Sequence, residues 1–178
     1  NEGFVKRAVS QQDARRTVVE LTEVGQAVVD AVPSNIVVGV HAHDDSGVAV
    51  ANSLAAVRGG ASLVQGTANG VGERTGNANL NAIIGALALK GSQICKEGID
   101  VACSDNLHLL ADAARFVDET LNLIPRKSQP YVGASAFAHK GGLHVSALAK
   151  NSAAYEHVDP AKVGNEQRVL VSELSGRA

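Results

Sequence analysis

Hydrophobic and polar positions follow two different periods along the first half of the chain. Apolar residues recur at helical spacing over residues 13–32, and the same spacing returns over 48–57 and 77–89. Between these segments lie a short, continuous β-branched run, 36–40, and a second segment that predicts a strand, 62–67. The first run is typical of a strand buried on both faces of a sheet. The pattern predicts the order helix, strand, helix, strand, helix.

Strands that alternate with helices through short connections indicate a parallel sheet. We therefore predict an α/β fold, and specifically the C-terminal part of a (β/α)8 TIM barrel followed by an appended helical and loop subdomain. A doubly wound sheet is the alternative. Both architectures place functional groups at the C-terminal ends of the strands.

The character of the sequence changes near residue 104. Residues 105–123 predict a long amphipathic helix, and the polar, proline-bounded segment 125–130 predicts a linker. We therefore divide the chain into a partial barrel, 1–103, and a helical linker and subdomain, 104–178. The apolar side of the predicted helix is formed by Leu109, Leu110, Ala113, Phe116, Val117 and Leu121.

Composition narrows the class of protein. The formal net charge is −2 and aromatic residues make up only 3% of the chain, so we expect no nucleic-acid partner, which would need a basic patch or stacking rings. No apolar run approaches a membrane span, and no signal peptide is visible. Cys95 and Cys103 are expected to be reduced thiols in a cytoplasmic protein. Because methionine is absent, we expect an internal piece of a longer protein or a chain with residues left out.

The strongest chemical signal directly follows the first predicted strand. His41 and His43 are two residues apart, so their side chains point to the same face at the strand end. Two neutral imidazoles suit a divalent metal such as Zn, Mn or Co. Asp44 or Asp45 would supply a carboxylate that fixes the histidine tautomers. The alternative is a pair of surface histidines without a metal.

Two glycine-rich segments follow. The segment 69–79 comes after the second predicted strand, and its glycines do not have the spacing of a dinucleotide-binding loop. It is either a flexible turn or a loop that brings the side-chain oxygen of Asn77 to the same metal. The segment 135–144 carries His139 and His144, and these residues alone favour histidines that satisfy nearby backbone groups.

The chain resembles a known enzyme family over most of residues 36–178. The stretches 41–80, 135–148 and 155–177 together are similar to the 2-isopropylmalate, homocitrate and citramalate synthase family. The histidine-bearing segment and the tail from residue 169 most resemble the citramalate synthase branch. The isopropylmalate branch has His-Gln-Asp where this chain has His144 followed by Val145 and Ser146.

The resemblance implies a TIM barrel with appended subdomains that works as a homodimer. It implies that His41 and His43 bind a divalent metal (Zn, Mn, Mg or Co), with Asn77 in or next to the metal shell. It further implies that His144 and Tyr155 are catalytic and reach in from the partner subunit. The implied reaction joins acetyl-CoA to a 2-oxo acid. The resemblance to the citramalate synthase branch implies that this 2-oxo acid is pyruvate.

Two family motifs are missing from the chain. The family has an Asp-Arg-Glu motif on its first strand, and a Cys-Asp-Thr loop one strand before the paired histidines; here residues 17–21 run directly into the predicted helix. We therefore expect about half of an active site. Inside the family, 2-isopropylmalate or homocitrate synthase is the alternative. From another class, the alternative is an inactive metal-binding or dimerisation module.

Overall fold

A computed structural model describes residues 5–9, 17–21, 23, 27, 30–31, 36–95, 99–139, 147, 151 and 156–169. The chain divides into two compact units, residues 1–37 and residues 38–178, which are described separately. No helix within the described ranges is both long and apolar enough to cross a membrane.

The first unit contains an antiparallel pair of strands, β1 (Val5–Val9) and β2 (Thr17–Leu21), in which Val5 pairs with Leu21 and Val9 with Thr17. The helix predicted over 13–32 is therefore wrong across 17–21. Thr17, Val18 and Val19 are three consecutive β-branched residues, which favour extended backbone over helix. Among the described residues of this unit, helical backbone occurs after β2, at Glu23, Ala27 and Asp30.

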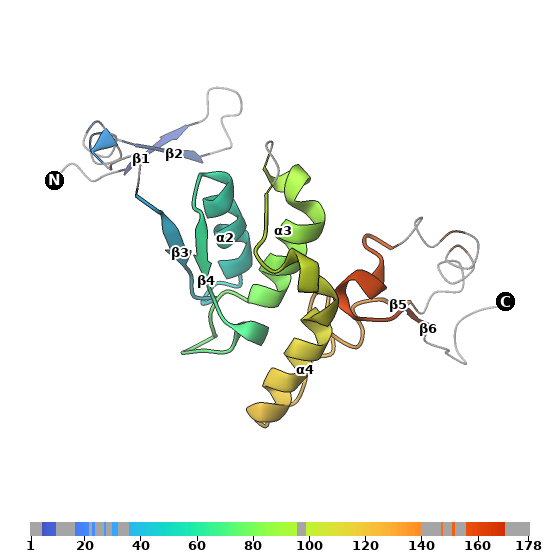
Figure 1. Ribbon diagram of the computed structural model, residues 1–178. Helices are drawn as coiled ribbons and strands as arrows, with labels where there is room; N and C mark the ends of the chain where they lie inside the picture. The colour runs from blue at the N-terminus through green and yellow to red at the C-terminus, as the bar shows by residue number, and fades with distance from the viewer. Residues whose placement is uncertain are drawn as a thin grey trace. The chain divides into compact units, whose positions relative to one another are not determined.

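The second unit begins with a strand–helix–strand motif. Strand β3 (Gly39–His41) leads into helix α2 (Ala49–Arg58), which returns the chain to strand β4 (Leu63–Gln65). The two strands lie side by side in Figure 1 and are parallel. Gly39 lies beside Leu63 and His41 beside Gln65. The predicted parallel βαβ unit is confirmed, although both strands are shorter than expected.

These strands are buried on one face rather than two. Val64 packs against the apolar core, whereas Val38 is 49% exposed and Leu63 is 47% exposed. Within the described part of the chain, β3 and β4 pair only with each other. The prediction of burial on both faces is therefore wrong for this chain, because the second face has no covering layer among these residues. The core on the covered face is formed by Ala49, Ala78, Ile83 and Leu87.

Helix α3 (Leu80–Ile94) follows the glycine-rich segment, which includes the short 3-10 helix η1 (Ala68–Gly70). The helix was predicted from residue 77 but begins at Leu80. Asn79 caps it, because its side-chain oxygen accepts a hydrogen bond from the backbone N–H of Asn81 at 3.0 Å. The cap leaves residues 77–79 extended beside the two strands.

Helix α4 (Leu110–Thr120) is preceded by the 3-10 helix η2 (Ser104–Leu109), so the helix predicted over 105–123 exists in a shorter α-helical form. Its predicted apolar side is right at Leu110, which is buried, but wrong at Phe116, which is 68% exposed, and at Ala113, which faces solvent. The buried side carries Leu110, Ala111, Ala114 and Asp118. Spacing alone could not identify this side, because one of its residues is an acid.

A second core joins α3 and α4 to the chain that follows them. The predicted linker does not stay free of the fold: Gln129, at its end, is buried, and Tyr131 and Val132 continue into this core. The core also receives the 3-10 helix η4 (Pro160–Val163). Its buried members are Leu107, Leu110, Ala111, Ala114, Tyr131, Val132, Phe137, Val158 and Val163.

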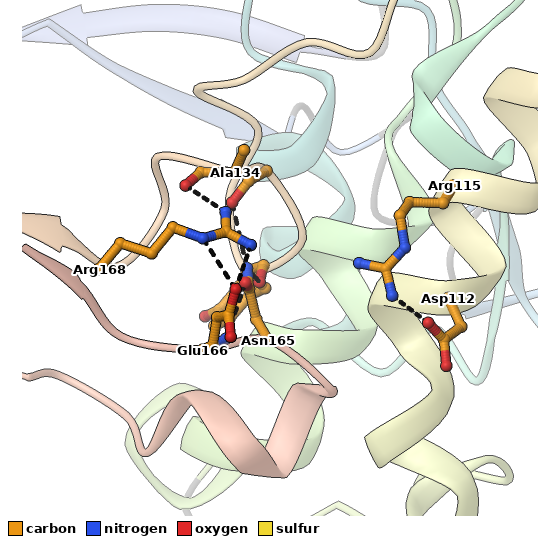
Figure 2. Close-up of polar contacts among 8 residues, drawn as sticks. Asp112, Arg115, Ala134, Asn165, Glu166 and Arg168 are labelled. Carbon is orange, nitrogen blue, oxygen red and sulfur yellow. Dashed lines mark hydrogen bonds and ion pairs between the residues drawn. The ribbon is translucent and has the colours of Figure 1, made fainter.

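Polar contacts hold the last described segment against this core. Strand β6 (Arg168–Val169) runs parallel to β5 (Ala138–His139). The Arg168 guanidinium donates to the Ala134 carbonyl at 2.6 Å and to the Glu166 carboxylate at 2.8 Å, and Figure 2 shows these contacts converging. The Asn165 amide donates to two carbonyls of the 131–133 turn, at 2.9 and 3.1 Å.

Candidate metal centre

The two candidate metal ligands stand at the C-terminal end of β3. His41 is the last residue of the strand, and His43 lies two residues further along extended chain. Their ring centroids are 5.1 Å apart, with an angle of 75° between the ring planes. The structure therefore brings both imidazoles to one side of the strand end, as the two-residue period predicts.

Asn77 is brought to the same place by the backbone of residues 76–79. This segment pairs with the chain after β3: the Ala78 N–H donates to the Ala42 carbonyl, and the Asp44 N–H donates to the Gly76 carbonyl, both at 2.9 Å. An antiparallel bridge sets His43 directly opposite Asn77. Side chains of directly opposed residues are close neighbours, so the amide joins the imidazoles at one strand end.

Two buried polar atoms at this point have no hydrogen-bond partner. They are the Nδ1 atom of His43 and the Oδ1 atom of Asn77. The Asn77 amide nitrogen is occupied, because Nδ2 donates to the Val71 carbonyl at 3.3 Å, so its oxygen is held free to accept. Buried polar atoms are nearly always paired, so two unpaired ones at the same point indicate a binding site for a group that they would contact. An imidazole nitrogen and an amide oxygen both have lone pairs that fit a divalent metal.

The donor set on this chain is incomplete for a full coordination shell. No group of three or more His, Cys, Asp or Glu side chains with metal-binding geometry occurs among the residues that the structure places. The candidate centre therefore consists of two histidines and one amide. Any further protein ligand would come from outside the described residues.

The glycine-rich loop is built to hold Asn77. Gly72 has a φ of +156°, and a Cβ at this position would lie 2.4 Å from the Asn77 amide nitrogen. Gly76 has a φ of +100°, and a Cβ there would lie 2.0 Å from the carbonyl oxygen of Gly70. That carbonyl accepts the backbone N–H of Asn77 at 3.1 Å. These close approaches require glycine, so the loop has a defined shape rather than that of a flexible turn.

Neither neighbouring aspartate is hydrogen-bonded to the histidines. Asp44 accepts the backbone N–H of Ala49 at 2.8 Å, which stabilises the start of α2. Asp45 forms a two-bond ion pair with Arg74, 2.8 Å for each bond, and accepts from Thr75 at 3.3 Å. The Arg74 hydrogen bond is the main reason that the pKa of Asp45 lies below its usual value. The prediction that one of these carboxylates fixes a histidine tautomer is therefore wrong for the arrangement seen here.

The two predicted catalytic residues, His144 and Tyr155, lie outside the described residues, so their roles stay predictions. The structure does place a neighbouring pair that the sequence did not reveal. His139 Nε2 lies 3.1 Å from Glu156 Oε1, and both side chains are largely buried. This contact joins β5 to the chain directly after Tyr155. Seventeen residues separate the two partners, and no local spacing signals the pair.

Comparisons with known proteins identify the family of the chain. The HMGL-like family model matches residues 16–117, and the homocitrate synthase post-HMGL domain-like model matches residues 131–178. The chain belongs to the HMGL-like family, a TIM-barrel family, and the described part has the mixed α/β character of such a protein.

The relatives identify the branch. The chain is 54% identical to an (R)-citramalate synthase of Aquifex aeolicus over 141 residues, and 56% identical to one of Geobacter sulfurreducens over 140 residues. Each match covers 79% of the chain but only 26% and 25% of the relative, so the chain spans about a quarter of their length. A probable 2-isopropylmalate synthase of Methanopyrus kandleri is 37% identical over 158 residues, covering 89% of the chain and 30% of the relative. The predicted resemblance to the citramalate synthase branch is confirmed.

Proposed function

We propose that this chain forms part of a citramalate-synthase-like acyltransferase, which joins acetyl-CoA to pyruvate at a divalent metal. The observation that carries the proposal is the pair of buried, unpartnered atoms, His43 Nδ1 and Asn77 Oδ1, beside a second imidazole at a strand end. The relatives named (R)-citramalate synthase support the same reaction. We place the enzyme in the cytoplasm and its chain in the C-terminal part of the barrel.

His41, His43 and Asn77 would hold the metal. A divalent ion such as Zn, Mn, Mg or Co bound there would supply a Lewis acid for the ketone of a 2-oxo acid. The protein's contribution is to fix these donors before the substrate arrives. Backbone pairing of His43 with Asn77, and the hydrogen bond from the Asn77 amide to the Val71 carbonyl, keep both orphan atoms in place.

The condensation needs a base, because the acetyl methyl group is a weak acid. We assign this base to His144, assisted by Tyr155, since an unperturbed imidazole titrates near neutrality. A methyl proton moves to the imidazole, and the resulting carbon nucleophile forms a bond to the ketone carbon of pyruvate. The π electrons of the ketone move to its oxygen, which takes up a proton and becomes the hydroxyl of the product. Water then cleaves the thioester, which releases free CoA and the carboxylate product. In a homodimer, His144 and Tyr155 would reach the site of the partner subunit.

Release of free CoA tests the proposed reaction. The complete protein is stripped of metal, reloaded with Mn²⁺, and mixed with acetyl-CoA and a 2-oxo acid, and the new thiol is followed with a thiol reagent. We expect turnover with pyruvate that disappears in the metal-free protein and in His41→Ala. Faster turnover with 2-oxoisovalerate would assign the protein to the 2-isopropylmalate branch. No CoA release with any 2-oxo acid would favour an inactive metal-binding or dimerisation module.

A dominance experiment tests the crossing of His144 between subunits. A double variant, His41→Ala with His144→Ala, is mixed in equal amount with unsubstituted chains and allowed to exchange. If His144 acts across the dimer, both sites of a mixed dimer are inactive, so the unsubstituted chains lose about half of their activity. If His144 acts within its own subunit, those chains keep their full activity. The single variant His41→Ala is the control, since it leaves the partner's site intact in either case.

A further inference from the structure

A network of buried polar side chains connects the glycine-rich loop to helix α4. Asn69, which has a left-handed φ of 59°, is its central member. Its amide nitrogen donates to the Ala114 carbonyl at 2.8 Å and to the Asp118 carboxylate at 2.6 Å. Its amide oxygen accepts from Asn81 Nδ2 at 2.5 Å and from Gln129 Nε2 at 3.3 Å. One asparagine thus contacts α3, α4 and the turn that follows α4.

Asp118 is the acidic member of this network and is only 7% exposed. A buried carboxylate is unfavourable unless hydrogen bonds compensate it. Within the described residues, the donor that its side chain receives is the Asn69 amide. Hydrogen bonds to an ionised acceptor are roughly twice as strong as neutral ones. The contact therefore constrains the Asn69 side chain, and with it the strained backbone that Asn69 occupies.

The constraint passes from Asn69 to the metal centre over a short stretch of backbone. The carbonyl oxygen of the next residue, Gly70, accepts the backbone N–H of Asn77 at 3.1 Å. Gly76 packs so closely against the same oxygen that a Cβ at residue 76 would clash with it. Moving Asn69 therefore moves the Gly70 carbonyl, which moves the Asn77 backbone. The Asn77 amide oxygen is one of the two orphan atoms of the candidate centre.

We propose that Asp118 is a positioning residue for the metal centre, acting through Asn69 on the loop that carries Asn77. The inference rests on the proposed function, because it takes the metal to bind at Asn77. Asp118 touches neither metal nor substrate in this account. Its effect is to fix one ligand from a helix outside the strand ends.

A charge exchange between the two residues tests the proposal. Asn69→Asp places a carboxylate against the Asp118 carboxylate, so we expect Mn²⁺ affinity in the complete protein to fall roughly 10- to 100-fold, the range for residues that support a ligand. Adding Asp118→Asn restores a donor and an acceptor across this one contact and should recover part of that affinity, because the hydrogen bond from residue 69 to the Ala114 carbonyl stays lost. Asp118→Asn alone keeps an acceptor for Asn69 and should have a smaller effect. Binding is measured from the free Mn²⁺ signal in electron paramagnetic resonance.

Two control variants separate positioning from general destabilisation. Asp112 lies on the same helix and pairs with Arg115 in the exposed contact drawn in Figure 2, so Asp112→Asn should leave Mn²⁺ affinity unchanged. Val163 is fully buried in the core beside α4 but makes no part of the network. Val163→Ala should therefore lower the melting temperature without weakening Mn²⁺ binding.

The outcomes distinguish this inference from the proposed function. If the unsubstituted protein binds Mn²⁺ and His43→Ala abolishes binding, the metal centre stands. Unchanged binding in Asn69→Asp, or no recovery in the double variant, would then overturn the role of Asp118 alone. If the unsubstituted protein binds no Mn²⁺, the metal centre is overturned and the role of Asp118 with it.

Discussion

Substituting alanine for Gly76, in the glycine-rich segment that carries Asn77, should lower stability and metal affinity more than the same substitution at Gly60. Gly76 and Gly60 have almost the same backbone angle, φ of +100° and +106°. A Cβ at Gly60 would meet no atom within 4 Å, whereas at Gly76 it would lie 2.0 Å from the Gly70 carbonyl oxygen. The two substitutions therefore share the conformational cost and differ only in the clash.

The structure sets the size of the difference. Placing alanine in left-handed backbone destabilises either position by about 1–2 kcal/mol. At Gly76 the obstacle is backbone, which cannot rotate away as a side chain would, so the loop must shift. Overpacking of this kind adds about 1–3 kcal/mol. The shift also disturbs the hydrogen bond from the Asn77 N–H to Gly70. We therefore expect Gly76→Ala to be more destabilising than Gly60→Ala by about 1–3 kcal/mol, and to weaken metal binding.

Urea denaturation and Mn²⁺ titration of the two variants, in parallel with the unsubstituted protein, measure both effects. The prediction requires a lower unfolding midpoint and a higher Mn²⁺ dissociation constant for Gly76→Ala, with near-normal Mn²⁺ binding for Gly60→Ala. Equal stability and equal affinity in the two variants would show that the loop tolerates a side chain at residue 76. The conclusion that the close approach of Gly76 to the Gly70 carbonyl holds Asn77 in place would then be wrong.

Gly72→Ala should raise the Mn²⁺ dissociation constant, because its Cβ would lie 2.4 Å from the Asn77 amide nitrogen; unchanged binding would refute this. Phe137 is 1% exposed, so Phe137→Ala should lower the free energy of unfolding by about 3–5 kcal/mol in a urea titration, and Phe137→Leu, which leaves a smaller cavity, should lower it by less. Because the Arg74 contact lowers the pKa of Asp45, that contact stabilises the fold above the ordinary pKa and is lost as pH falls through the lowered value. The difference in melting temperature between the unsubstituted protein and Asp45→Asn should therefore shrink between about pH 7 and about pH 3, and a difference that is constant with pH would contradict it.

Local periodicity was sufficient for the parts of the site that lie on one strand. The two-residue spacing of His41 and His43 determines that their side chains share a face, and the structure places the rings 5.1 Å apart. The alternation of strand and helix likewise predicts the parallel pairing of β3 with β4. Both inferences depend only on backbone geometry, which is the same in every sequence.

The remaining features depend on partners far away in the chain. The buried side of α4 includes Asp118, an acid that an apolar pattern assigns to solvent. Its burial depends on a hydrogen bond from Asn69, which is 49 residues away in the sequence, so spacing within the helix could not predict it. His139 and Glu156 form a pair for the same reason. In residues 17–21, helical spacing of valines coincided with a β-branched run, and strand pairing with residues 5–9 decided the outcome.

We propose that His41, His43 and Asn77 together bind one divalent metal. The most direct measurement is an anomalous-scattering map from crystals of the complete protein grown with Mn²⁺. We expect a single strong peak within bonding distance of a ring nitrogen of each histidine and close to the Asn77 amide oxygen. A map with no peak at this strand end, or with Mn²⁺ bound only elsewhere, would contradict it.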